Sequence, residues 1–243
     1  MPADSQPLPT VWARPRRERR EQPALSRAQI VSAALRLLDE EGVGALSMRR
    51  LGAVLNAGAT SMYTHVANKD ELIELVVDEV YGEVEVPSAA EAGGWREAVA
   101  GCARSMRATL LRHPWIASVQ GEVGVAYLGP NVLRLWERVL AVLEEAGFEL
   151  EAADRALNTV TAYVIGISTS EAAWLTTLAR SGRGEQEWAR ALWPAAEAAV
   201  RDHPRLRVLY AARRDRDAGR ARDEEFEDGL ACVLDGVAAR QAN

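Results

Sequence analysis

The sequence predicts an all-α protein, with an N-terminal three-helix helix-turn-helix head and a larger helical body behind it. Apolar residues recur at three- and four-residue spacing along most of the 243-residue chain. No stretch shows the alternating apolar and polar pattern of a half-buried β-strand. Glycine and proline residues fall between the apolar periods, where helices end.

We expect three segments. Residues 1–25 contain five prolines and form a flexible arm, residues 26–72 form the helix-turn-helix domain, and residues 73–243 form the body. Five arginines lie between residues 14 and 20 of the arm. They would contact phosphates or a minor groove, or they belong to a solvated tail, and the sequence favours neither reading.

Charge is divided unevenly along the chain. The net charge of −6 argues against a protein that coats DNA non-specifically. Residues 1–72 nevertheless carry a net charge of +2, whereas residues 73–243 carry −8. A basic front end on an acidic body is typical of a protein that contacts DNA with one part only.

Other compositional features limit the location and the cofactors. No apolar run is long enough for a membrane span, and the N-terminus has no signal-peptide core, so we expect a cytoplasmic protein without membrane contact. Cys102 and Cys232 lie in no Cys/His cluster and are expected to be reduced thiols. The sequence contains no cluster of metal-binding residues and no cofactor-binding motif, so we expect no cofactor and no metal.

The first helix of the head has clear start and stop signals. Ser26 and Gln29 form a capping box, and Ile30 begins an apolar repeat at helical spacing. Gly42 supplies a left-handed stop. Ser47 is expected to cap the second helix.

The turn and the next two helices follow directly. Asn56 lies in the turn, where a left-handed conformation is needed and asparagine tolerates it. The third helix is expected from about Ala59 to His65. Asn68 caps the fourth helix, with Glu71 at its third position.

Polar side chains concentrate on and beside the third helix, where a helix-turn-helix reads the major groove. The candidate DNA contacts are Arg49, Thr60, Ser61, Tyr63, Thr64, His65 and Lys69. Arg49 on the second helix is the best candidate for a bidentate guanine contact, and Tyr63 and Lys69 are typical phosphate contacts. Met62 and Val66 should point into the core. Alternatively, His65 is a packed histidine, Tyr63 a core residue and Lys69 a solvated one.

These motifs resemble the tetracycline-repressor (TetR) family of bacterial transcription regulators. The residues that carry the resemblance are LSMRRL at 46–51, Tyr63–His65–Val66 and the Asn68-Lys69-x-x-Leu72 helix start, within residues 26–85. The resemblance implies that the seven candidate residues contact operator DNA. Ala59 stands where the tetracycline repressor has a base-reading glutamine, so the operator should differ, because a methyl group cannot read adenine bidentately.

The body is expected to be helical over 93–112, 114–122, 129–147, 151–180, 185–201 and 224–241. The charged run at 213–225 is expected to be a mobile surface loop. A weaker resemblance to the tetracycline repressor covers residues 129–174 and the last helix, and it implies a ligand-binding and dimerisation domain. In that family the long helix and the last helix form a four-helix interface in a homodimer.

The last helix carries the predicted dimer interface. Its residues are Phe226, Gly229, Leu230, Val233, Gly236 and Val237. The two glycines are seven residues apart and share one helical face. Because glycine destabilises a helix by about 1 kcal/mol relative to alanine, a close backbone approach would explain them. The alternative is that this helix packs within its own chain.

A ligand pocket is the less certain part of the prediction. Its expected lining is Glu85, Cys102, Met106, Tyr127, Trp136, Tyr163, Glu171 and Trp174. Glu171 lies within an apolar stripe and should be paired, at an interface or beside a wet cavity. By resemblance, Tyr127 replaces a metal-binding histidine of the tetracycline repressor. The expected effector is therefore a small organic molecule other than magnesium tetracycline.

The sequence thus favours a ligand-responsive repressor that an effector releases from a palindromic operator. A ligand-independent regulator or an activator of the same fold is the alternative. An enzyme with an appended DNA-binding head is disfavoured, because the chain has no nucleophile or phosphate-binding motif and its three histidines are scattered.

Overall fold

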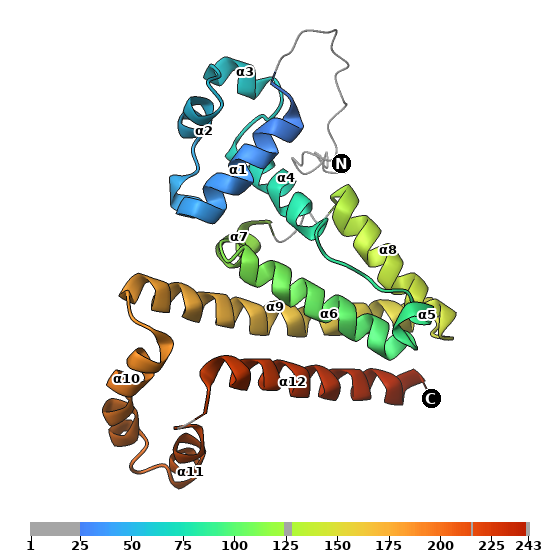
Figure 1. Cartoon of the computed structure of the whole chain (residues 1–243). Coiled ribbons are helices and arrows are strands. Elements are labelled where there is room, and N and C mark those ends of the chain that lie inside the picture. The colour runs from blue at the N-terminus through green and yellow to red at the C-terminus, as the bar shows by residue number, and fades with distance from the viewer. Residues whose placement is uncertain (1–24, 124–127, 215, 242–243) are drawn as a thin grey trace, which may run out of the picture. The chain divides into compact units, whose positions relative to one another are not determined.

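The computed structural model describes residues 25–123, 128–214 and 216–241, and every regular element within these ranges is a helix (Figure 1). This confirms the all-α prediction. The chain divides into two compact units, residues 1–157 and 158–243, and α9 contributes to both. In chain order the elements are α1 (Arg27–Glu41), η2 (Val43–Ala45), α2 (Met48–Val54), α3 (Ala59–Tyr63), α4 (Lys69–Tyr81), α5 (Ala89–Ala92), α6 (Trp95–Arg112), α7 (Ile116–Val123), α8 (Pro130–Glu145), α9 (Leu150–Ser181), α10 (Glu185–Ala199), α11 (Pro204–Arg213) and α12 (Ala218–Gln241).

The start signal of α1 is confirmed. Ser26 Oγ accepts a hydrogen bond from the Gln29 amide at 3.1 Å, and Gln29 Oε1 accepts one from the Ser26 amide at 2.8 Å. Two amides at the helix start are thereby satisfied. Gly42 ends α1 with a φ of +76°, which residues other than glycine rarely adopt, but its ψ of 177° lies outside the predicted left-handed helical region.

The tight turn between α2 and α3 depends on one asparagine and one glycine. Asn56 has a φ of +47°, as predicted. A Cβ on Gly52 would lie 2.9 Å from the carbonyl oxygen of Ala57, so the turn can approach α2 only at a glycine. Met62 and Val66 are fully buried, which confirms that these two residues point into the core.

Helix α4 joins the head to the body within the first unit. Its cap is confirmed, since Asn68 Oδ1 accepts a hydrogen bond from the Glu71 amide at 2.8 Å. Helix α4 packs against α1 in the head and against α6, α7 and α8 beyond it. Because one continuous helix touches both parts, a displacement in the body can reach the head through α4.

A buried carboxylate fastens α4 to the start of α8. Asp78 Oδ1 accepts hydrogen bonds from the backbone amides of Asn131 and Val132, each at 3.0 Å. Asn131 Nδ2 returns a bond to the Asp78 carbonyl oxygen at 3.1 Å. Burial raises the pKa of Asp78 above its ordinary value, although the two amide bonds oppose this shift. The carboxylate acts as a helix cap supplied from another helix.

Several predicted boundaries in the body are wrong. The expected helix at 93–112 begins only at Trp95, and the short helix α5 precedes it. Helix α11 was not predicted. The charged run expected to be a loop is partly helical, because α12 begins at Ala218.

Charge pairing explains why the charged run folds as helix. Asp217 Oδ1 accepts a hydrogen bond from the Arg220 amide at 2.8 Å and so caps the start of α12. Glu224 forms ion pairs with Arg216 and Arg220. Glu224 and Arg220 are one helical turn apart, and such pairs stabilise a solvated helical segment. No helix among the described residues is long and apolar enough to cross a membrane.

Candidate DNA-reading head and body sites

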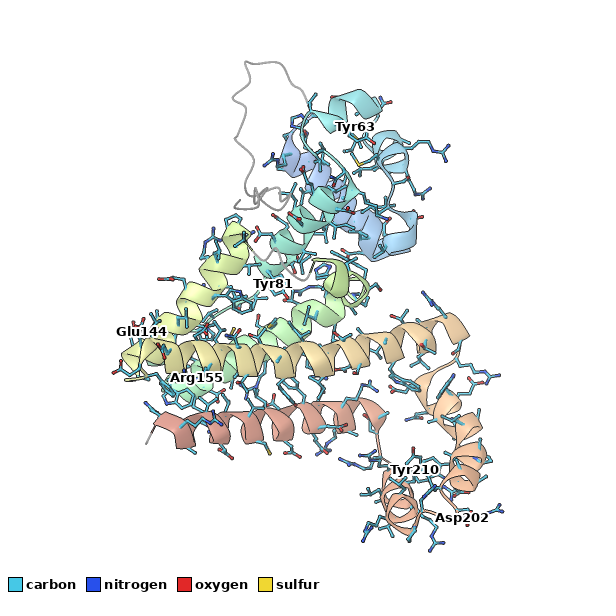
Figure 2. All side chains as sticks on the ribbon, turned by 180° about the vertical axis from the view of Figure 1, so that it is seen from behind. Tyr63, Tyr81, Glu144, Arg155, Asp202 and Tyr210 are labelled. Atoms are coloured by element: carbon cyan, nitrogen blue, oxygen red, sulfur yellow. The ribbon has the colours of Figure 1, made fainter. Side chains whose placement is uncertain are left out.

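A hollow of about 530 Å³ opens between α2 and α3, on the surface where a DNA-reading site is predicted. It is lined by Met48, Arg49, Gly52, Ala53, Asn56, Ala57, Gly58 and Tyr63. The side chain of Tyr63 is about half exposed, on α3 (Figure 2). An arginine and an exposed tyrosine thus share one concave surface of the helix-turn-helix.

Two neighbouring arginines on α2 differ in their surroundings. Arg50 forms an ion pair with Glu41 at the end of α1. Arg49 is exposed, and among the described residues it has no ion-pair or hydrogen-bond partner. Its guanidinium can therefore make two parallel bonds to a ligand without first breaking a contact with the described part of the protein.

The polar residues of α3 and the following turn are mostly exposed. Ser61, Tyr63 and Thr64 reach solvent, and the Thr64 hydroxyl donates to the Ser61 carbonyl oxygen at 2.6 Å. His65 is half-buried, and its carbonyl oxygen accepts a bond from Arg27 Nη2 at 3.3 Å. The side chain of Thr60 lies outside the described residues.

Lys69 lies at the first position of α4. Its Nζ lies 3.3 Å from the carbonyl oxygen of Val43 in η2. An ammonium group has three donors, so two remain for a phosphate. The structure brings Arg49, the α3 residues and Lys69 onto one small head, and their contacts with DNA stay predictions.

In the body, the predicted pocket residues of the first unit are only partly grouped. Cys102 and Met106 lie one turn apart on α6 and are both buried. Trp136 on α8 contacts Tyr81 edge to face, with ring centroids 6.2 Å apart. Glu85 is exposed, and its backbone amide donates to Ser105 Oγ at 2.9 Å. Tyr127 lies outside the described residues.

Burial raises the pKa of the Cys102 thiol to about 12. Because the thiolate is the reactive form, we expect native Cys232→Ser protein to resist a disulfide-exchange reagent near neutral pH. Its single thiol should react once the protein is unfolded in denaturant. Absorbance of the released thiol product measures this directly, and prompt labelling of the folded protein would contradict the buried, protonated state.

The predicted pocket residues of the second unit are held by contacts within that unit. The Tyr163 hydroxyl donates to the carbonyl oxygen of Phe226 at 2.8 Å. Glu171 Oε1 pairs with Arg222 Nε at 3.2 Å, as expected for a carboxylate in an apolar stripe. Trp174 Nε1 donates to Glu185 Oε1 at 3.2 Å.

Arg222 on α12 is the centre of this second group. It pairs with Glu185 on α10 through both terminal nitrogens and with Glu171 on α9 through Nε. Its hydrogen bonds hold the pKa of Glu185 below the ordinary value. The predicted lining is therefore divided between the two units, and one shared cavity stays a prediction.

The predicted dimer residues occupy two faces of α12. Phe226, Leu230 and Val237 are buried within the single chain. Gly229 is half-buried, and a Cβ there would lie 2.3 Å from the Tyr163 hydroxyl oxygen. The close approach at Gly229 is thus already made inside the chain. Val233 is half-buried and Gly236 is exposed, with nothing within 4 Å of an added Cβ.

The sequence reading missed the polar contacts that join distant segments. The sequence pattern does not single out Asp39, Asp78 or Glu83. His113 is the C-terminal cap of α6. Its side chain, however, contacts Asp39, which lies 74 positions earlier in the sequence. No local spacing indicates such a pair.

Taken together, a helix-turn-helix with an exposed reading surface, followed by a helical body, defines a DNA-binding regulator. A model for the bacterial regulatory proteins of the tetR family matches residues 30–76, and a model for the tetracyclin repressor-like C-terminal domain matches residues 86–241. The chain belongs to the TetR family of transcriptional regulators and is not an enzyme.

Individual relatives agree with this assignment. The HTH-type transcriptional repressor DrrR1 of Streptomyces coeruleorubidus is 32% identical over 95% of this chain and 84% of its own length. The class A tetracycline repressor from transposon 1721 of Escherichia coli is 30% identical, over 87% of this chain and 90% of its own. ActR of Streptomyces coelicolor in complex with actinorhodin has a TM-score of 0.73 and 33% identity, covering 90% of this chain and 99% of ActR.

Proposed function

We propose that this regulator is a repressor that binds a palindromic operator as a homodimer in the cytoplasm and is released by a small organic effector. Residues 26–72 would form the reading head and residues 73–243 the effector-binding and dimerisation body. The observation that carries the proposal is the concave head surface on which Arg49 and Tyr63 are exposed together. A two-fold dimer places two such surfaces about 34–36 Å apart, one turn of DNA.

In this proposal Arg49 reads a guanine, and the side chains around α3 hold the DNA backbone. Ser61, Tyr63, Thr64 and Lys69 carry donors that suit phosphate oxygens, and Thr60 and His65 complete the contact. Residues 1–72 carry the positive net charge that such a surface needs. Ala59 leaves a base contact of the tetracycline repressor unmade, so the two operators would differ.

The homodimer would use the face of α12 that the single chain leaves uncovered. Cys232 and Gly236 are exposed and Val233 is half-buried, at three- and four-residue spacing beside Gly229. The buried residues Phe226, Leu230 and Val237 would support this face from behind. Sedimentation equilibrium should give twice the chain mass of 26.5 kDa, and a monomer at micromolar concentration would contradict the proposal.

Release would be a population shift that α4 transmits. Helix α4 packs against α6, α7 and α8 in the first unit and continues into the head. An effector that binds the body in only one conformation would change the positions of the two heads and lower operator affinity. Couplings of this kind typically change affinity by about 5–150-fold.

The effector is proposed to be an organic molecule that needs no magnesium ion. Similar ActR structures contain actinorhodin or (S)-DNPA. The thiol of Cys102, the thioether of Met106 and the phenol of Tyr127 are poor magnesium ligands, because hard oxygen ligands are preferred. Actinorhodin is therefore a rational first probe for the body.

Tetracycline tests this exclusion. We expect tetracycline with magnesium to leave the intrinsic tryptophan fluorescence of the protein unchanged. Tetracycline itself absorbs light, and the same titration of free tryptophan amide gives the loss of signal that this absorption causes. Tight, saturable quenching beyond that control would contradict the proposed effector class. The class A tetracycline repressor is a positive control for the reagents.

A further inference from the structure

A charged cluster of the first unit joins the head to the body at a point away from the reading surface. His113 Nδ1 lies 2.6 Å from Asp39 Oδ1, and His113 Nε2 lies 3.2 Å from Glu83 Oε2. Trp115 Nε1 donates to the same Asp39 oxygen at 2.8 Å. Arg112 Nη2 pairs with the same Glu83 oxygen at 2.8 Å. We call Asp39, Glu83 and His113 the latch.

The latch places one imidazole ring between two carboxylates. Each ring nitrogen of His113 lies within hydrogen-bonding distance of a carboxylate oxygen from a different segment of the chain. The His113 side chain is 6% exposed, whereas those of Asp39 and Glu83 are 31% and 35% exposed. Replacing the ring removes both contacts, whereas removing one carboxylate removes only one of them.

The position of the latch separates it from ordinary core packing. Asp39 lies in the last turn of α1, where the helix dipole disfavours an acidic residue without a positive partner. Glu83 follows the end of α4, and His113 lies at the junction of α6 and α7. The latch is thus a second connection between the head and the body, in addition to the continuous helix α4.

We propose that His113 is a positioning residue that locks the orientation of the DNA-reading head through Asp39 and Glu83. The inference rests on the two-headed operator binding proposed above. One head can reach a single half-site by turning the whole molecule, so it does not need a fixed orientation. Two heads bind two half-sites at the same time only when the orientation of each head relative to its body is fixed. The latch should therefore affect the affinity for the complete operator and not the affinity for a single half-site.

The test compares two DNA probes. The first is a duplex of about 30 base pairs recovered with the wild-type protein from a random-sequence pool, and the second is the same duplex with one half-site scrambled. Fluorescence anisotropy at fixed salt gives both affinities. His113→Gln should bind the complete duplex about tenfold more weakly than wild type and the scrambled duplex with unchanged affinity.

Two further variants control for damage to the fold. His203→Gln changes an exposed histidine that caps α11 without a side-chain bond, and it should behave as wild type on both probes. Asp39→Asn keeps the shape of the side chain and removes its charge. It should weaken binding to the complete duplex as much as His113→Gln or less, because it changes only the His113–Asp39 contact. The double variant should bind no more weakly than His113→Gln, which already removes that contact.

Each outcome decides the proposal. Equal affinity of His113→Gln and wild type for the complete duplex would overturn it, and so would an equal loss on both probes or additive losses in the double variant. If circular dichroism shows that His113→Gln does not fold, Asp39→Asn decides by the same criteria. A wild-type protein that does not distinguish the two duplexes would instead contradict the two-headed reading itself, and the latch proposal with it.

Discussion

Gly129→Ala is expected to destabilise the protein by about 1–3 kcal/mol, because the new methyl group has no space beside Asp78. A Cβ at Gly129 would lie 2.0 Å from Asp78 Oδ1 and 2.8 Å from the Asp78 Cβ. The carboxylate cannot move aside without losing its bonds to the amides of Asn131 and Val132. The backbone at Gly129 has a φ of −68° and a ψ of 145°, which alanine adopts easily, so the cost is one of space.

Urea denaturation followed by circular dichroism measures this loss. Gly166→Ala is the matched control, since Gly166 lies within α9 with nothing within 4 Å of an added Cβ. It should leave stability unchanged or raise it by up to about 1 kcal/mol, because alanine is the better helix former. The double variant Asp78→Ala with Gly129→Ala should be no less stable than Asp78→Ala alone. A Gly129→Ala protein as stable as wild type would show that the two helices are not fastened in this way.

Arg49→Ala is expected to weaken operator binding by about 1–3 kcal/mol and to relax the sequence requirement at one base pair. The physical reason is that a bidentate guanidinium contact distinguishes guanine from the other bases. Anisotropy measurements on a set of duplexes, each with one base pair replaced, give the loss at each position. At one base-pair position, replacement should weaken the binding of wild type strongly and the binding of Arg49→Ala very little.

A second arginine separates base reading from charge. Arg155 lies on α9 and is exposed, with Glu151 as its partner one turn away. Arg155→Ala removes the same charge far along the sequence from the head, so it should leave both affinity and sequence preference almost unchanged. If Arg49→Ala weakens every duplex by the same factor, Arg49 contacts only phosphate, and the proposed base contact is wrong.

Local signals in the sequence were sufficient to predict the head. Capping at Ser26 and Asn68, the positive φ at Asn56 and the burial of Met62 and Val66 each depend on residues a few positions apart. Propensity and hydrophobic period act over the same short distances. The fold of the head therefore follows from its own sequence, and its contacts with DNA stay predictions.

The contacts that assemble the body could not be predicted in this way. Asp78 caps a helix that begins 52 positions later, and the short helix α11 has no buried residue to give it an apolar period. The composition of the charged run at 213–225 is typical of a loop, whereas its second half forms the start of α12. For Gly229, the sequence predicted a close backbone approach at a dimer interface, whereas the structure shows the Tyr163 side chain of the same chain beside it.

The most direct test of the central claim is a hydroxyl-radical footprint of the wild-type protein on the recovered operator duplex. Two heads that place α3 in successive major grooves should protect two patches on one face of the DNA, about one helical turn apart. Methylation of a guanine N7 within each half-site should interfere with binding of wild type but not with that of Arg49→Ala. A single protected patch, or protection spread evenly along the duplex, would contradict the account.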